Sequence, residues 1–266
     1  MDLPKNIPPD LSNLLQTMAS DFPAVLRGNL VGIYLWGSLT YDAFDESCSD
    51  VDCIVVIRRD LDDREFSDLD DWFKNQKEQN RWVDRIDMRF VIDHELLDKA
   101  SRCCGFYHDT GKLARHGSDG NPIIWLNIGG SGITLWGKDA KLISPRVSDQ
   151  CLNDALLLEL KYLKEDLTAN AGDRSEKAFI HNAYAVFTAC RIFYSASHRA
   201  LASKDRAHAW AIETVPPMWR AVVQAAKHNR LKNAGSATPQ LEQDAMRYIE
   251  FVTGEVNRIL GRSTQT

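Results

Sequence analysis

The sequence predicts an α+β protein with two domains: a mixed β-sheet with flanking helices in residues 1–146, and an all-helical bundle in residues 147–266. Strand-like and helix-like segments alternate as far as Ser144-Pro145, which we expect to form the hinge. Beyond this point, apolar residues recur only at helical spacing. The chain of 266 residues is also long enough for two modest domains, each with its own hydrophobic core.

The first domain opens with a predicted helix, because apolar residues in 9–26 follow the spacing of a helix with one exposed face. Short apolar segments rich in strand-forming residues follow at 29–36, 50–57 and 85–92. The polar, acidic stretch 62–79 is predicted to be an exposed helix before the last of these strands. In that last strand the side chains alternate, so Asp87 and Arg89 share one face.

The remainder of the first domain is less regular in sequence. We expect a short helix over 93–100, capped by Asp93. We expect an irregular surface loop over 105–121, because that stretch is rich in glycine. Two further apolar segments lie on either side of the glycines at 129–132.

The second domain is predicted to hold five helices with short connections, which favours a bundle. The predicted helices are 148–167, 175–196, 204–214, one that begins at Pro216-Pro217, and one from Thr238-Pro239 to about Leu260. Proline suits the first turn of a helix, so both proline-containing starts agree with this assignment.

The overall charge disfavours nucleic acid as a partner: 32 Lys and Arg residues against 37 Asp and Glu residues give a formal net charge of −5. No apolar run approaches the ~18 residues that a membrane span needs. The first residues also lack the basic-then-apolar order of a secretory signal. The six cysteines form no C-x-x-C pair, so we expect reduced thiols in a cytoplasmic protein without a membrane partner.

Asp50 and Asp52 enter the second predicted strand and are the most informative residues of the sequence. Residues two apart on a strand lie on the same face, and two such carboxylates repel each other unless a cation lies between them. Oxygen ligands at this separation suit Mg²⁺. If the strand of Asp87 is a neighbour, three carboxylates converge and can hold two Mg²⁺ ions about 4 Å apart for phosphoryl transfer. One carboxylate near the attacking group could also act as a general base.

Gly37 and Ser38 follow the first predicted strand, and eleven residues separate Ser38 from Asp50. Glycine permits the close approach of a phosphate, and the serine hydroxyl adds a hydrogen-bond donor. If a helix starts at Leu39, its free N–H groups face an anion. We therefore expect a phosphate-binding turn beside the metal-binding carboxylates.

The segments WGS, SDVDCIVVI and RIDMRFV together resemble the nucleotidyltransferase fold of the DNA polymerase β superfamily. In the second half, ACRIFY (189–194), SKDRA (203–207), WAIE (210–213) and PPMWR (216–220) resemble the helical C-terminal domain of the aminoglycoside adenylyltransferases that act on streptomycin and spectinomycin. The resemblance extends from about residue 28 to about residue 260.

The resemblance implies roles for individual residues. Asp50 and Asp52 hold Mg²⁺ in this interpretation, and Asp87 is both a metal ligand and the catalytic base, where the family has the longer glutamate. The residues implied to bind ATP are Gly37, Ser38, Ser49, Arg191 and Lys204. An arginine and a lysine thirteen residues apart match the family's spacing and suit a triphosphate that leaves as pyrophosphate.

The antibiotic-binding positions of the family match this sequence poorly. The family places acidic residues before the helical arginine, whereas Lys177 and His181 stand at the aligned positions here, and a lysine repels a cationic aminoglycoside. The residues that we expect at the acceptor are Tyr107, Glu176, His181 and Tyr184.

The implied function is Mg²⁺-dependent transfer of AMP from ATP to a hydroxyl of a small acceptor, an aminoglycoside or aminocyclitol antibiotic such as streptomycin or spectinomycin. ATP and the acceptor are the expected partners, and a monomer or weak homo-oligomer is the expected assembly. Two alternatives stay open. One is the same chemistry on another small molecule or a protein side chain, and the other is a regulator that senses ATP and makes no product.

Overall fold

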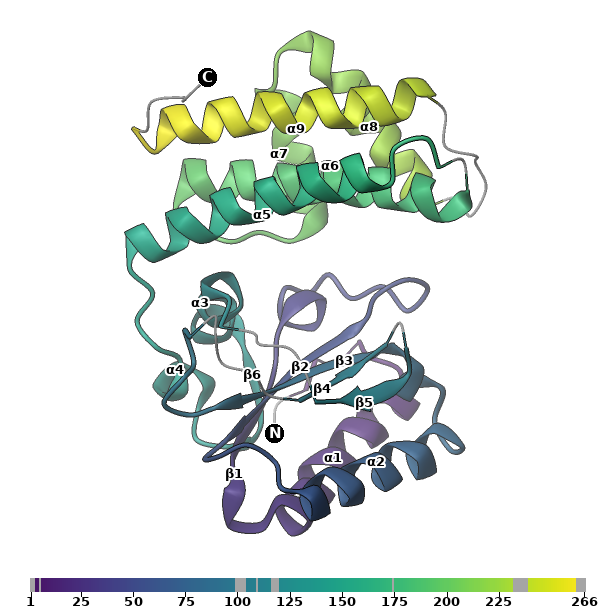
Figure 1. Cartoon of the computed structure of the whole chain (residues 1–266), viewed down its shortest axis with the longest axis vertical. Helices are drawn as coiled ribbons and strands as arrows, with labels where there is room; N and C mark the ends of the chain where they lie inside the picture. The colour runs from purple at the N-terminus through teal and green to yellow at the C-terminus, as the bar shows by residue number, and fades with distance from the viewer. Residues whose placement is uncertain are drawn as a thin grey trace. The chain divides into compact units, whose positions relative to one another are not determined.

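The computed structural model describes residues 3–4, 6–98, 104–108, 110–115, 120–173, 175–231 and 239–261. The chain separates into two compact units, residues 1–147 and 148–266 (Figure 1). The first unit contains a mixed β-sheet with helices, and the described part of the second contains helices without strands. The predicted α+β class is confirmed.

A six-stranded sheet with the order β5-β4-β3-β2-β1-β6 forms the centre of the N-terminal unit. Its strands are β1 (Leu30–Leu35), β2 (Val51–Ile57), β3 (Ile86–Ile92), β4 (Gly105–Tyr107), β5 (Lys112–Ala114) and β6 (Ile133–Gly137). β2 and β3 are parallel, whereas all other neighbours are antiparallel. The parallel pair needs a crossover, and α2 (Asp63–Lys77) supplies it between the two strands.

Helices cover both faces of this sheet. They are α1 (Pro9–Leu26), α2, α3 (Pro122–Ser131) and α4 (Ala140–Ile143). α1 and α2 lie together on one face, where Leu14 and Phe73 belong to the same core as Val55 (Figure 1). On the other face, Trp125 of α3 packs in a core with Ile54. The two apolar segments noted on either side of residues 129–132 form different elements: the first is helix α3 and the second is strand β6.

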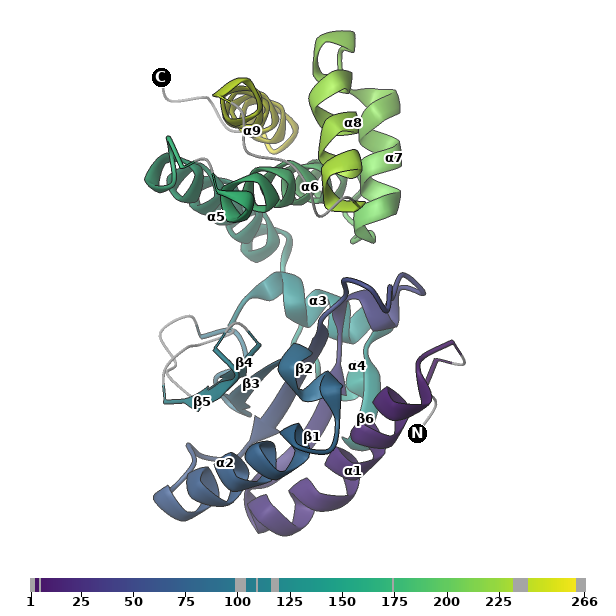
Figure 2. The ribbon, with the colours of Figure 1, turned by 90° about the vertical axis from the view of Figure 1, so that its right-hand side faces the viewer.

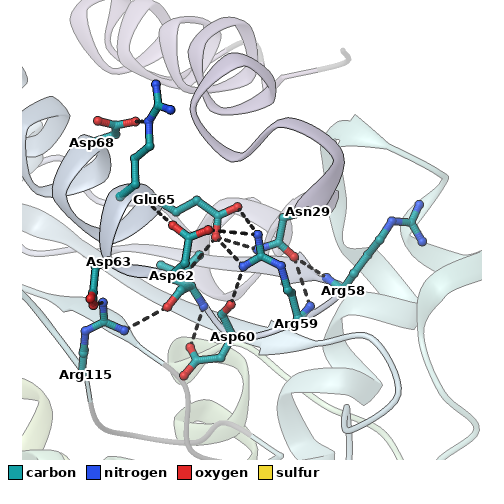
Figure 3. Close-up of polar contacts among 11 residues, drawn as sticks. Asn29, Arg58, Arg59, Asp60, Asp62, Asp63, Glu65, Asp68 and Arg115 are labelled. Carbon is teal, nitrogen blue, oxygen red and sulfur yellow. Dashed lines mark hydrogen bonds and ion pairs between the residues drawn. The ribbon is translucent and has the colours of Figure 1, made fainter.

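A buried carboxylate, Glu65, fixes the beginning of α2 (Figure 3). Asp62 accepts a hydrogen bond from the Glu65 N–H at 2.9 Å, and Glu65 accepts one from the Asp62 N–H at 3.1 Å, which completes a capping box. Glu65 also accepts from Arg59 Nη1 at 2.9 Å and from Asn29 Nδ2 at 3.1 Å. Because these donors flank β1 and β2, the network ties the start of α2 to the sheet.

Helices α5 (Asp149–Ala169), α6 (Glu176–His198), α7 (Lys204–Thr214), α8 (Pro217–Leu231) and α9 (Pro239–Ile259) form the described part of the C-terminal unit. α6 contacts each of the other four, and α7 and α8 lie side by side (Figure 2). Cys190 of α6 is buried against α9, with its Sγ 3.2 Å from the Tyr248 hydroxyl. Among the helices over the described residues, none combines the length and apolar character that crossing a membrane requires.

The predicted helix over 93–100 is wrong for its described part, residues 93–98. Two consecutive turns stand there, with the Glu95 N–H donating to the Ile92 carbonyl at 2.9 Å and the Asp98 N–H to the Glu95 carbonyl at 2.8 Å. So short a segment forms too few helical hydrogen bonds to offset the cost of helix nucleation. Leu96 instead enters the core beneath α3.

The predicted loop over 105–121 is also wrong in part, because β4 and β5 form a hairpin that extends the sheet beyond β3. Gly105 permits this close pairing, since a Cβ there would lie only 2.9 Å from the Met88 carbonyl oxygen. Phe106 is buried and stacks on Phe73 with ring centroids 3.9 Å apart. Two of the glycines that suggested a loop thus have other roles: Gly105 serves strand pairing, and Gly111, with φ of 61°, serves the hairpin turn.

Candidate functional site

Asp52 and Asp87 lie directly opposite each other on the parallel strands β2 and β3. Both side chains are half-buried. Alternation along β2 places Asp52 on the same face as Ile54, the face that α3 covers. Neighbouring strands are about 4.8 Å apart, so the sheet holds the two carboxylates at adjacent positions.

Asp50 occupies a different position from this pair. It precedes β2 by one residue, and it is exposed. Over the described part of the chain, no group of three or more His, Cys, Asp or Glu residues is arranged so that it could hold a metal ion. The structure therefore places Asp52 beside Asp87, and Asp50 does not join them in a cluster of three carboxylates.

Gly37 packs against the Asp52 carboxylate, and a side chain at position 37 would overlap Asp52 Oδ2. Its φ of 73° also lies in the region that favours glycine. The Gly37 N–H donates to Asn127 Oδ1 of α3 at 2.7 Å, and Asn127 is buried. Sequence reasoning missed Asn127, because its role depends on α3 packing beside this turn.

No helix starts at Leu39, so the condition set for an anion-binding helix end is not met: residues Gly37–Thr40 form a single 3-10 turn, η2. Within it, the Thr40 hydroxyl donates to the Gly37 carbonyl at 2.9 Å. The Ser38 carbonyl accepts from the N–H groups of Tyr41 and Ala43 at 3.3 and 3.2 Å. The turn thus places Gly37 beside Asp52, with Ser38 as the next residue.

Ser49 is buried in the loop that leads into β2, where its hydroxyl accepts from the Asp45 N–H at 2.9 Å. Arg85, from the 3-10 turn η3 (Arg81–Arg85), donates to the carbonyls of Ser49 and of Glu46, the latter at 2.6 Å. The Arg85 guanidinium also lies over the Trp82 ring at 4.7 Å. These contacts fix the backbone immediately before Asp50.

Asp87 is paired with Arg89, which follows it two residues later on the same face of β3. Arg89 Nη1 donates to Asp87 Oδ1, and Arg89 Nη2 lies 3.3 Å from Asp87 Oδ2. The guanidinium stacks over Tyr107 of β4 at 3.9 Å, and His108 Nδ1 lies 3.8 Å from Asp87 Oδ2. Sequence reasoning placed Arg89 on this face but missed its pairing, although the period-two spacing was a usable signal.

Arg191 and Lys204, the two predicted phosphate-binding residues, belong to α6 and the start of α7. Arg191 is half-buried, and its Nε donates to the Ala202 carbonyl at 3.3 Å. Lys204 Nζ lies 5.7 Å from the centre of the Tyr184 ring. Tyr184 and Arg191 are two helical turns apart on one face of α6, and Lys204 of α7 lies near the Tyr184 ring.

His181 stands one turn before Tyr184 on α6, and its Nδ1 lies 3.5 Å from Asp166 Oδ2 of α5. Tyr184 is 51% exposed. The side chains of Glu176 and Lys177 lie outside the described residues. Of the predicted acceptor residues, His181 and Tyr184 therefore share a face of α6, whereas Tyr107 stands beside Arg89 in the other unit.

Comparisons with known proteins match both units. Residues 143–255 match the family described as aminoglycoside adenylyltransferase, C-terminal domain. Spectinomycin 9-adenylyltransferase of Campylobacter jejuni is 21% identical over 248 residues, which cover 89% of this chain and 92% of that protein. The crystal structure of spectinomycin adenyltransferase AAD(9) from Enterococcus faecialis with ATP and spectinomycin is similar in fold, with a TM-score of 0.67, 15% identity, and coverage of 92% of this chain and 99% of that one.

Similarity to one kind of enzyme along most of the chain establishes its class: the protein is a nucleotidyltransferase. Within that class, residues 143–255 match the aminoglycoside adenylyltransferase C-terminal domain, and the relatives that the chain resembles over most of its length are spectinomycin adenylyltransferases. The resemblance seen in the motifs of residues 189–220 is thereby confirmed.

Proposed function

We propose that this enzyme transfers AMP from ATP to a hydroxyl of an aminoglycoside or aminocyclitol antibiotic such as spectinomycin or streptomycin. The observation that carries the proposal is the register of Asp52 opposite Asp87 on parallel strands, in a chain whose relatives are spectinomycin adenylyltransferases. Two carboxylates held side by side suit the metal-assisted displacement that AMP transfer requires.

The residues around Asp52 fit a divalent cation. Carboxylate oxygens are the hard ligands that Mg²⁺ prefers, and the absence of a side chain at Gly37 makes room for the Asp52 carboxylate beside that turn. In the proposal, Asp50, Asp52 and Asp87 are the residues that would hold two Mg²⁺ ions. Bound Mg²⁺ supplies charge neutralisation at the phosphates.

Other steps of the proposed reaction are assigned to side chains of the protein. Asp87 accepts the proton of the acceptor hydroxyl, whose oxygen forms a bond to the α-phosphorus of ATP as the bond to pyrophosphate breaks. Arg191 and Lys204 bind the departing phosphates through their fixed positive charge, and Gly37, Ser38 and Ser49 contact the nucleotide. His181, Tyr184, Tyr107 and Glu176 are the proposed contacts to the acceptor.

Substitution Asp52→Ala tests the proposal. We expect transfer of radiolabelled AMP to spectinomycin and streptomycin to fall by about 100-fold or more, because the carboxylate pair is lost. Asp68→Ala, on the exposed face of α2, is a matched control and should leave transfer unchanged. Full activity of the Asp52→Ala variant would contradict the proposed role of the pair.

A second candidate is the same transfer to a less cationic acceptor. The observation that favours it is the positive charge of Arg89 beside Asp87. This charge reduces the negative potential that a cationic antibiotic seeks. Labelled ATP that modifies neither spectinomycin nor streptomycin, while Asp52-dependent transfer to another hydroxyl compound occurs, would favour this candidate.

A further inference from the structure

Arg89 binds the proposed catalytic base with both ends of its guanidinium. Nη1 donates to Asp87 Oδ1 and Nη2 lies 3.3 Å from Oδ2, so both carboxylate oxygens face the same cation. The two side chains are only 20% and 25% exposed. A paired contact of this kind is among the stronger charged hydrogen bonds in proteins, and partial burial limits its screening by water.

The surroundings of Arg89 hold the guanidinium in this place. The residue opposite Arg89 on β4 is Gly105, which has no side chain to displace it. Two residues further along β4, the Tyr107 ring lies 3.9 Å from the guanidinium carbon. Stacking on an aromatic ring favours the cation and restricts its rotamers, so the pair with Asp87 is preorganised.

A metal ion held by Asp87 would need oxygen atoms that Arg89 already binds. We propose that Arg89 is the resident counter-cation of Asp87 in the metal-free enzyme, and that a divalent metal binds by displacing Arg89 from at least one oxygen of Asp87. This inference rests on the metal site of the proposed function. Arginine stays protonated at all accessible pH values, so Arg89 competes with the metal at any pH used in the measurement.

Manganese binding measures this competition without any catalytic turnover. The full-length protein, freed of metal and without ATP, is titrated with Mn²⁺ and the free ion is followed by electron paramagnetic resonance. We expect Arg89→Gln to bind Mn²⁺ with a Kd about fivefold lower than the unsubstituted enzyme, because the competing cation is removed. An equal or higher Kd in a folded Arg89→Gln variant would overturn the proposal.

Arg89→Lys separates direct pairing from the general effect of a nearby positive charge. Lysine keeps the charge but lacks the planar fork that engages two oxygens, so its Kd should lie between the other two. A Kd equal to that of the unsubstituted enzyme would show that only long-range charge matters, which contradicts the proposal. If Arg89→Gln does not fold by circular dichroism, Arg89→Lys carries the same test.

Arg115 offers a matched control, because it also lies over an aromatic ring, that of Phe66, and pairs with an aspartate, Asp63. Arg115→Gln should leave the Mn²⁺ Kd unchanged, and an equal tightening there would overturn the assignment to Arg89. Asp52→Ala distinguishes a failure of the proposed metal site from a failure of the proposed role of Arg89. If it binds Mn²⁺ as the unsubstituted enzyme does, the proposed metal site fails. If it loses binding while Arg89→Gln changes nothing, only the role of Arg89 fails.

Discussion

At the scale of single residues, the absence of an atom matters as much as the presence of a functional group. Gly37 adopts a positive φ, which glycine tolerates best, and it lies so close to Asp52 that a side chain would overlap the carboxylate. Glycine is therefore favoured at this position for two reasons. Asn127 then fixes the turn through the Gly37 N–H. The direction of the Asp52 carboxylate thus depends on residues that carry no charge.

Substitution Gly37→Ala should lower both stability and AMP transfer. A Cβ at this position overlaps Asp52 Oδ2 and the φ of 73° strains the backbone, so we expect a loss of about 2 kcal/mol in the free energy of unfolding. Urea denaturation followed by circular dichroism measures it. Gly130→Ala, where a Cβ meets nothing within 4 Å, is the matched control and should be neutral or slightly stabilising.

At the scale of elements, the loop before β2 is held by the turn before β3. Arg81 donates to Glu46 Oε1 at 2.6 Å, and Arg85 donates to the backbone carbonyls of Glu46 and Ser49. Both guanidinium groups lie over the ring of Trp82, at 4.9 and 4.7 Å from its centre. Two segments more than thirty residues apart in sequence are therefore joined where Asp50 enters the sheet.

Arg85→Ala should release this loop and misplace Asp50. We expect AMP transfer to fall by about tenfold, the lower end of the range for groups that support metal ligands. Hydrogen exchange should become faster at the amides of Cys48 and Ser49, which now donate to the Asp45 carbonyl. Arg58→Ala, at the other end of β2, provides the comparison, and the same loss of activity in it would argue against a specific role of Arg85.

At the scale of the whole molecule, each unit has its own core, and the helical core contains a buried titratable group. His208 of α7 is 2% exposed, and its Nε2 lies 2.9 Å from the Val223 carbonyl of α8. Burial lowers the pKa of His208 below its ordinary value of 6.5. The folded helical unit therefore favours the neutral imidazole, and it resists protonation more than the unfolded chain does.

Stability should consequently decline as the pH falls below about 6.5, the pKa of histidine in the unfolded chain. Above that pH, His208 is neutral in both states and its contribution is fully present; below it, the unfolded chain binds the proton first and is favoured. The Tm measured between pH 7.5 and 5 should fall less steeply in His208→Gln than in the unsubstituted protein. Parallel slopes would show that His208 is not responsible.

Much of the secondary structure could be predicted from the sequence, because periodicity is a local property. The helical spacing in residues 9–26 predicted α1, and the alternation in 85–92 predicted β3 and the shared face of Asp87 and Arg89. The short strands β4 and β5 could not be predicted, since a three-residue strand has no period of its own and is stable only through pairing with β3.

The sequence by itself determined the α+β class, the family motifs and the identity of the candidate carboxylates. Only the tertiary structure decided that Asp52 stands opposite Asp87, that Asp50 is exposed, and that Arg89 occupies both oxygens of Asp87. The reason is physical: propensity and period act between residues close in sequence, whereas strand register and ion pairing depend on which distant segments share a core.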